Sequence, residues 1–149
     1  MRSVPRKLAL ALIFAGVAGC GPQAQKPTGP VVTGEGFAGV KFGMTVAQAE
    51  AALGHKLLTD NPDDVDDNGC RYYHPGKSFL GLSFMTADGV IVRLDVYDTK
   101  DIMTEAGAKI GDGEQHVLDL YKGRVRVEPH FYTGPEGHYV LVLGPDGKA

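Results

Sequence analysis

The acidic stretch at 60–69 contains the residues whose types and spacing best match a metal site. Asp64, Asp66 and Asn68, followed by Gly69, fit the first half of the calcium-loop pattern. Oxygen ligands at alternate positions suit Ca²⁺, and the glycine permits a sharp turn. The twelfth position of such a loop calls for a bidentate Glu, but this chain has Pro75 there. We therefore expect a solvated surface loop, with a calcium-binding envelope protein as an alternative.

Residues that could support catalysis occur without the spacing that catalysis needs. The histidines follow no H-x-x-x-H pattern and no Cys/His ligand spacing, so they do not indicate a metal centre. The serines lack the G-x-S-x-G turn that exposes a nucleophile. We therefore expect a protein that is not an enzyme and that carries no cofactor. The histidines are His55, His74, His116, His130 and His138.

Aromatic and arginine side chains are better candidates, because they contribute strongly to protein–protein contacts. Strand alternation should place about half of the aromatic residues in the core. Outward Arg/Asp and Arg/Glu pairs could be either simple cross-strand pairs or part of a recognition surface. The aromatic set is Tyr72, Tyr73, Tyr97, Phe131, Tyr132 and Tyr139. From these patterns we predict a partner-binding surface containing Tyr73, Arg93, Tyr97, Arg126 and Tyr132.

An antiparallel hairpin over residues 80–97 should position part of this surface. Apolar residues alternate along both halves, and Ala87-Asp88-Gly89 between them is a tight-turn signal. The residues expected to face the core are Leu80, Leu82, Phe84, Val90, Val92, Leu94 and Val96. The other face should be solvated or used for binding, and carries Ser83, Arg93, Asp95 and Tyr97.

A short helix is expected earlier in the chain, in the segment 39–54. Val40 and Phe42 should form a short buried run, followed by a turn at Gly43. Thr45 and Gln48 have capping-box spacing, and Gly54 can end the helix in a left-handed conformation. The apolar helix face is expected to consist of Ala49, Ala52 and Leu53.

The segment 107–121 aligns with 39–53 at an offset of 68 residues. Gly39, Lys41 and Gly43 of the first segment match identical residues in the second. Asp112 and Gln115 are expected to cap a second helix, and strand-like runs follow at 124–130 and 138–143. An internal repeat favours two similar units, about 37–100 and 105–149. We expect the second unit to be incomplete, with an exposed sheet edge.

The first nineteen residues have the features of a bacterial export signal. Three basic residues precede a short apolar run, which ends in Val17-Ala18-Gly19-Cys20. This ending resembles a lipobox, which implies cleavage before Cys20 and a lipid anchor on its sulfur. Gly21, rather than Asp, implies the outer membrane in a Gram-negative host. Residues 20–36, rich in Pro and Gly, are expected to form a flexible linker ahead of a globular part that begins near Phe37.

Charge and cysteine content restrict the classes of partner. Without residues 1–19 the chain has 12 basic and 18 acidic residues, and it lacks a basic cluster. Nucleic acid is therefore not an expected partner, because its binding depends on neutralising phosphates. With Cys20 lipidated, Cys70 has no second cysteine in the chain, and we expect it to be a small buried residue, with an intermolecular disulfide as the alternative.

The segment Gly43-Met44-Thr45-x-x-Gln48, ending in Leu53-Gly54, resembles the signature of the SmpA/OmlA (BamE) family of outer-membrane lipoproteins. It also resembles the repeats of the β-lactamase inhibitory protein. The resemblance implies an α+β fold with helices on one face of an antiparallel sheet, here in two tandem units. It also implies a non-catalytic role in binding an envelope protein. An inhibitor or ligand-binding module that uses the open sheet face is the alternative.

Overall fold

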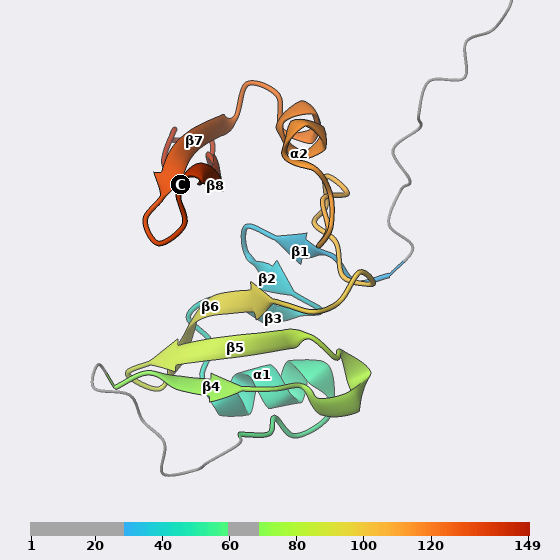
Figure 1. The fold of residues 1–149 in the computed structure, drawn as a ribbon. Helices are drawn as coiled ribbons and strands as arrows, with labels where there is room; N and C mark the ends of the chain where they lie inside the picture. Colours follow the sequence, from blue (N-terminus) through green and yellow to red (C-terminus); the bar gives the residue numbers. More distant parts are fainter. Residues whose placement is uncertain (1–28, 60–68) are drawn as a thin grey trace, which may run out of the picture.

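The computed structural model describes residues 29–59 and 69–149, and it has the expected α+β class (Figure 1). Cys20 and the three calcium-loop residues Asp64, Asp66 and Asn68 lie outside the described residues. The strands form three small antiparallel sheets, in the orders β1-β2-β3, β4-β5-β6 and β7-β8. The elements are β1 (Val32–Thr33), β2 (Gly36–Phe37), β3 (Val40–Lys41), α1 (Val46–Leu53), β4 (Arg71–Tyr73), the 3-10 turn η1 (Gly76–Ser78), β5 (Leu82–Ala87), β6 (Val90–Val96), α2 (Glu114–Leu120), β7 (Val125–His130) and β8 (Gly134–Val142).

One hydrophobic core joins the first two sheets and α1. Burial of these apolar side chains is the main driving force for folding of this part. The buried members are Phe37, Val40, Ala49, Leu57, Leu82, Phe84, Ile91 and Ile102. Ile102 belongs to the segment that follows β6, so this segment is packed onto the same core.

Helix α1 forms as its sequence predicts. Thr45 Oγ1 accepts from the Gln48 N–H, and Gln48 Oε1 accepts from the Thr45 N–H at 2.9 Å, which completes the capping box. Gly54 ends the helix with φ of 77°. The core-facing side consists of Val46, Ala49 and Leu53. Ala52, which was predicted on this side, is exposed.

Phe42 was also predicted to be buried, and this prediction is wrong. Its side chain is 41% exposed, while Val40 two residues earlier is 1% exposed. The chain turns at Gly43, which has φ of 85°, and the Gly43 N–H donates to the carbonyl of Ile91 in β6. The turn therefore follows the edge of the sheet and leaves Phe42 on the outside.

The hairpin β5–β6 forms with Asp88 and Gly89 at its turn, both with positive φ. A register shift between Met85 and Thr86 changes which side chains face the core. Ile91 pairs with Thr86 and is 1% exposed, whereas Val92, predicted to be inside, is 45% exposed. An extra residue in one strand of a pair is a β-bulge, which reverses the alternation beyond it. Leu80 precedes β5 and is also exposed, in contrast to its predicted position.

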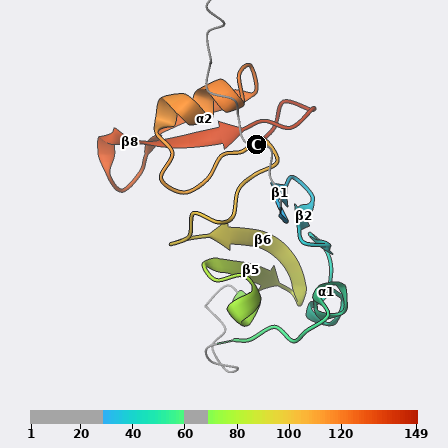
Figure 2. The same cartoon turned by 90° about the vertical axis from the view of Figure 1, so that its right-hand side faces the viewer.

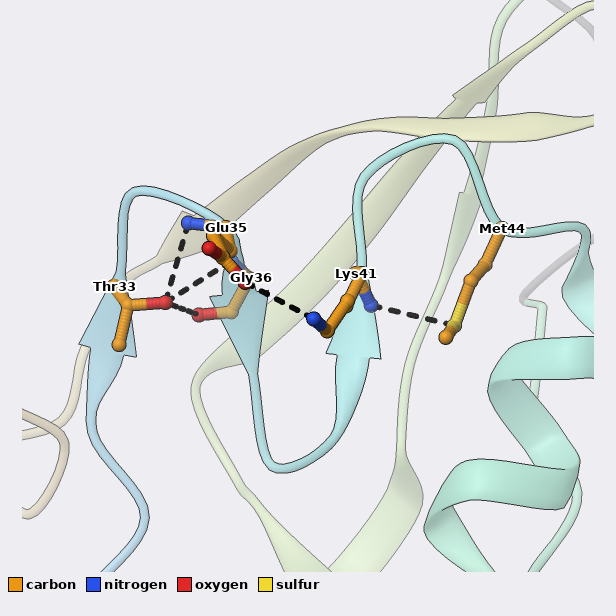
Figure 3. A network of polar contacts seen from close by, with 5 residues as sticks. All are labelled: Thr33, Glu35, Gly36, Lys41 and Met44. Carbon is orange, nitrogen blue, oxygen red and sulfur yellow. Dashed lines mark hydrogen bonds and ion pairs between the residues drawn. The ribbon is translucent and has the colours of Figure 1, made fainter.

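Ordered structure begins before Phe37, so the predicted linker 20–36 is too long. Val32 and Thr33 pair with Phe37 and Gly36. Figure 3 shows the polar contacts around this pair: Thr33 Oγ1 accepts from the N–H groups of Glu35 and Gly36, and Lys41 Nζ lies 3.0 Å from Glu35 Oε2. The Lys41 N–H also reaches Met44 Sδ at 3.4 Å, so the network extends to the turn before α1.

The segment at 107–121 copies the local backbone of the first segment. Gly107 and Gly111 have φ of 95° and 92°, close to 89° and 85° at Gly39 and Gly43. Helix α2 begins 68 residues after α1. Asp112 and Gln115 were predicted to cap this helix, but the N-cap residue is Gly113, and no side chain forms a capping hydrogen bond there. The Asp112 carboxylate instead accepts from the N–H of Lys109 at 2.9 Å.

The groups that follow the two helices differ. A three-stranded sheet follows α1, and the two-stranded β7–β8 hairpin follows α2. Figure 1 shows α2, β7 and β8 grouped apart from α1 and the β4–β5–β6 sheet, and Figure 2 shows α2 and β8 apart from α1, β5 and β6. Two tandem units of one kind therefore remain a prediction.

Candidate functional site

The face of the β4–β5–β6 sheet that points away from the core gathers polar and aromatic side chains from two strands. The strand register places Tyr72 of β4 and Arg93 of β6 on either side of Met85. Directly paired residues lie on the same face of a sheet, and residues two apart on one strand share it. Tyr72, His74, Arg93, Asp95 and Tyr97 thus belong to one surface, which we call the open face.

Arg93 is held at the centre of the open face by two neighbours. Its Nη2 donates to the Tyr72 hydroxyl at 2.7 Å, and its Nε and Nη2 both donate to Asp95 Oδ2 at 3.1 Å. The guanidinium carbon also lies 5.8 Å from the centre of the Tyr72 ring. The hydrogen bond to Asp95 is the main cause that raises the pKa of Arg93 above its ordinary value. Arg93 is therefore a charged donor that is held in one orientation on an exposed surface.

An apolar hollow lies at the end of the open face. The Tyr97 hydroxyl is 3.2 Å from His74 Nδ1, and both residues line the hollow, which has a volume of about 360 Å³. Its apolar walls include Leu58, Phe79 and Leu80, of which Leu58 is 57% and Leu80 71% exposed. Exposed apolar side chains gathered beside polar groups mark interaction sites more often than scattered ones do.

The five residues of the predicted partner surface fall in three places. Arg93 and Tyr97 lie on the open face, as the alternation indicated. Tyr73 lies on the opposite face, paired with Phe84 and packed against the core. Arg126 and Tyr132 belong to the β7–β8 hairpin and its turn.

Sequence reasoning placed Tyr73 at the surface in preference to its neighbour Tyr72, and it did not include His74. The signal that separates Tyr72 from Tyr73 is which of them pairs with a buried residue of β5. Tyr73 pairs with Phe84, which is 1% exposed, and Tyr72 pairs with the half-buried Met85. His74 follows from the same register, because it shares the face of Tyr72.

The other candidate sites can be placed only in part. Within residues 29–59 and 69–149, no three His, Cys, Asp or Glu side chains come together to hold a metal ion. Ser83 was predicted on the solvated face. It lies in the central strand β5 opposite Asp95 and is 4% exposed, so it is buried instead. Cys70 is half-buried. In the same residues, none of the helices is long and apolar enough to cross a bilayer.

No family model, curated protein or solved structure matches this chain.

Proposed function

We propose that this chain is a non-catalytic binding module of the bacterial envelope, anchored through lipid on Cys20, and that it binds a protein through the open face. The observation that carries the proposal is the arrangement of the open face: Arg93 is a charged donor held by Tyr72 and Asp95, and Tyr97 and His74 of the same face line an apolar hollow. Tyrosine and arginine beside apolar pockets are typical of binding hot spots. Side chains already held in place lose little entropy on binding.

The envelope part of the proposal is supported by sequence. The lipobox-like ending at Cys20 and the BamE-like segment Gly43–Gly54 both point to an outer-membrane lipoprotein. Its partner would then be another envelope protein, such as a component of outer-membrane assembly. A lipid anchor raises the local concentration of the module near such a partner.

The size of the hollow favours a second candidate function. Small-molecule sites typically have volumes of about 300 to 1,000 Å³ and apolar walls with a few polar groups. The hollow, at about 360 Å³ with His74 and Tyr97 among its lining residues, is at the lower end of this range. A ligand-binding or inhibitory module would use the same face without depending on the anchor.

Crosslinking and affinity capture of the whole chain from membranes test the proposal. We expect wild type to capture an envelope protein, and the double variant Arg93→Ala/Tyr97→Ala to capture at least about tenfold less. Cys20→Ala should lose the membrane fraction and the capture with it. Lys122→Ala, which changes an exposed residue after α2, is the matched control and should behave as wild type.

Either of two results would decide against a membrane-dependent protein partner. Capture unchanged in Arg93→Ala/Tyr97→Ala would show that the open face is not the contact surface. If the Cys20→Ala variant captured as much partner as wild type, an inhibitor or ligand-binding module would be the better interpretation.

A further inference from the structure

The group formed by α2, β7 and β8 buries little apolar surface. Helix α2 contributes no buried residue, and Val127 and Val142 are 41% and 38% exposed. A two-stranded hairpin is at best marginally stable in water, and stable sheets usually have three or more strands or a helix packed on them. Further strands added to this hairpin would extend its apolar face.

The outer edge of β7 is free to accept such a strand. The N–H of Leu143 donates to the carbonyl of Arg124, which makes these two residues a hydrogen-bonded pair. Hydrogen-bonded and non-hydrogen-bonded pairs alternate along an antiparallel ladder. The backbone groups of Val125, Val127 and Pro129 therefore point away from β8. Among the described residues, β8 is the single strand that pairs with β7.

The side chains of β7 make this edge complementary to itself. Arg126 Nε lies 2.8 Å from Glu128 Oε1, and both side chains project from the same face. If two β7 strands pair antiparallel about a two-fold axis at Val127, Arg126 of each copy lies opposite Glu128 of the other. Opposite charges directly across a strand pair are stabilising, and like charges are destabilising.

We propose that β7 pairs with β7 of a second copy of this chain, in the register centred on Val127. The four strands then follow the order β8-β7-β7-β8. Val127 can both donate and accept across the new pair. Val125 faces Pro129 of the other copy and can donate to its carbonyl, but it receives no hydrogen bond in return because Pro129 lacks an N–H. Pro129 therefore limits the pairing to a short segment, which favours a closed dimer over a longer ladder.

The position of α2 is compatible with this dimer. His138 Nδ1 of β8 lies 2.7 Å from Glu114 Oε2 of α2, and His138 pairs with Pro129. Helix α2 is thus attached on the face that carries Val125 and Val127. In the dimer, both copies of α2 would lie on one face of a four-stranded sheet, and the Arg126–Glu128 pairs would lie on the other.

Charge reversal provides the test, with two differently tagged copies of the whole chain purified in mild detergent. Arg126→Glu carries acidic residues at both positions, and Glu128→Arg carries basic residues at both. Each variant alone should associate with itself at least about tenfold more weakly than wild type. A mixture of the two variants should recover association, because every facing pair is then opposite in charge. The double variant Arg126→Glu/Glu128→Arg should also recover it.

The register is tested separately by cysteine crosslinking. Val127→Cys should form a disulfide with itself, because hydrogen-bonded partners have Cα atoms about 5.5 Å apart, within the range that a disulfide spans. Val142→Cys on β8 is the matched control, and the wild-type chain controls for Cys20 and Cys70. A monomeric wild type, a mixture that does not recover association, or faster crosslinking through Val142→Cys would each overturn the proposal. This surface is separate from the open face, so the two proposals can fail independently.

Discussion

Arg93 shows how strand pairing prepares a single side chain for binding. Tyr72 on β4 and Asp95 on β6 hold its guanidinium from two sides, although the side chain itself is about half exposed. Such a surface ion pair adds little to folding stability. Its effect is instead to fix a planar donor that can pair with a carboxylate or a carbonyl of a partner.

Gly81 is the residue at which a small change should have the largest effect near the binding surface. It has φ of 77°, and an added Cβ would lie 2.2 Å from the carbonyl oxygen of Tyr97. Gly81→Ala should therefore lower the free energy of unfolding by more than about 2 kcal/mol, because it combines backbone strain with a clash. Gly89→Ala is the matched control: its φ is 79° but no atom lies within 4 Å of the added Cβ, so we expect about 1 kcal/mol. Equal losses in urea denaturation would contradict the clash.

At the residue scale, the contacts that cap α1 could be predicted from the sequence, and the choice of the outward-facing side chain on β4 could not. Thr45, Gln48 and Gly54 act within one helix, so their spacing alone predicts their contacts. Whether Tyr72 or Tyr73 faces outward depends on the register with β5, a contact between residues far apart in the chain. Strand alternation places Tyr72 and Tyr73 on opposite faces of the sheet, but it does not tell which of the two faces packs against the core.

The β-bulge between β5 and β6 determines which residues of β6 pack on the core. The bulge allows both Ile91 and Leu94 to pack toward the core, although they are three residues apart on one strand. It also lets the start of β6 pair with the turn before α1, where the Ile91 N–H donates to the carbonyl of Met44 at 2.8 Å. Regular alternation predicts neither feature, because a bulge is defined by two strands together.

Alanine substitutions on either side of the bulge test this register. Ile91→Ala should lower the free energy of unfolding by about 2 to 5 kcal/mol, because it leaves a cavity in the core. Val92→Ala removes an exposed side chain and should cost less than about 1 kcal/mol. Chemical denaturation of both variants measures the difference. A larger loss of stability for Val92→Ala than for Ile91→Ala would contradict the bulge, because it would indicate regular alternation with Val92 facing inward.

Glu50 couples α1 to the segment that follows it, and this contact depends on pH. Its carboxylate accepts from Lys56 Nζ at 2.6 Å and from the Leu57 N–H at 3.1 Å. The hydrogen bond from Lys56 is the main cause that lowers the pKa of Glu50 below its ordinary value of 4.5. Because the pKa is lower in the folded state, the contact stabilises the folded state at pH values above the ordinary pKa. This stabilisation is lost as the pH falls through the lower pKa of the folded state.

The advantage of wild type over Glu50→Gln in melting temperature should therefore shrink between about pH 6 and pH 3. Thermal unfolding of both proteins across this range measures it. A constant difference between the two proteins would mean that the carboxylate contact does not contribute to stability.

The whole molecule combines a well-packed part with a poorly packed one. Among residues 29–59 and 69–149, the part built from β1–β6 and α1 holds nearly all the buried apolar residues, and the part built from α2, β7 and β8 adds Tyr121, whose hydroxyl donates to Thr104 Oγ1. The segment at 102–105 joins the two parts by bonding to Val32, which donates to the Met103 carbonyl at 2.9 Å. The glycine turns before each helix follow from the sequence repeat, whereas the strand number in each sheet does not.

Site-specific photo-crosslinking tests most directly whether the open face binds a protein. A photo-reactive amino acid would replace Tyr97 in the whole chain, produced in bacterial cells with Cys20 intact, and Lys122 would be the control position. We predict that the Tyr97 position crosslinks to one envelope protein and that the Lys122 position does not. Crosslinks to the same protein from both positions, or from Lys122 alone, would contradict the open face as the binding surface.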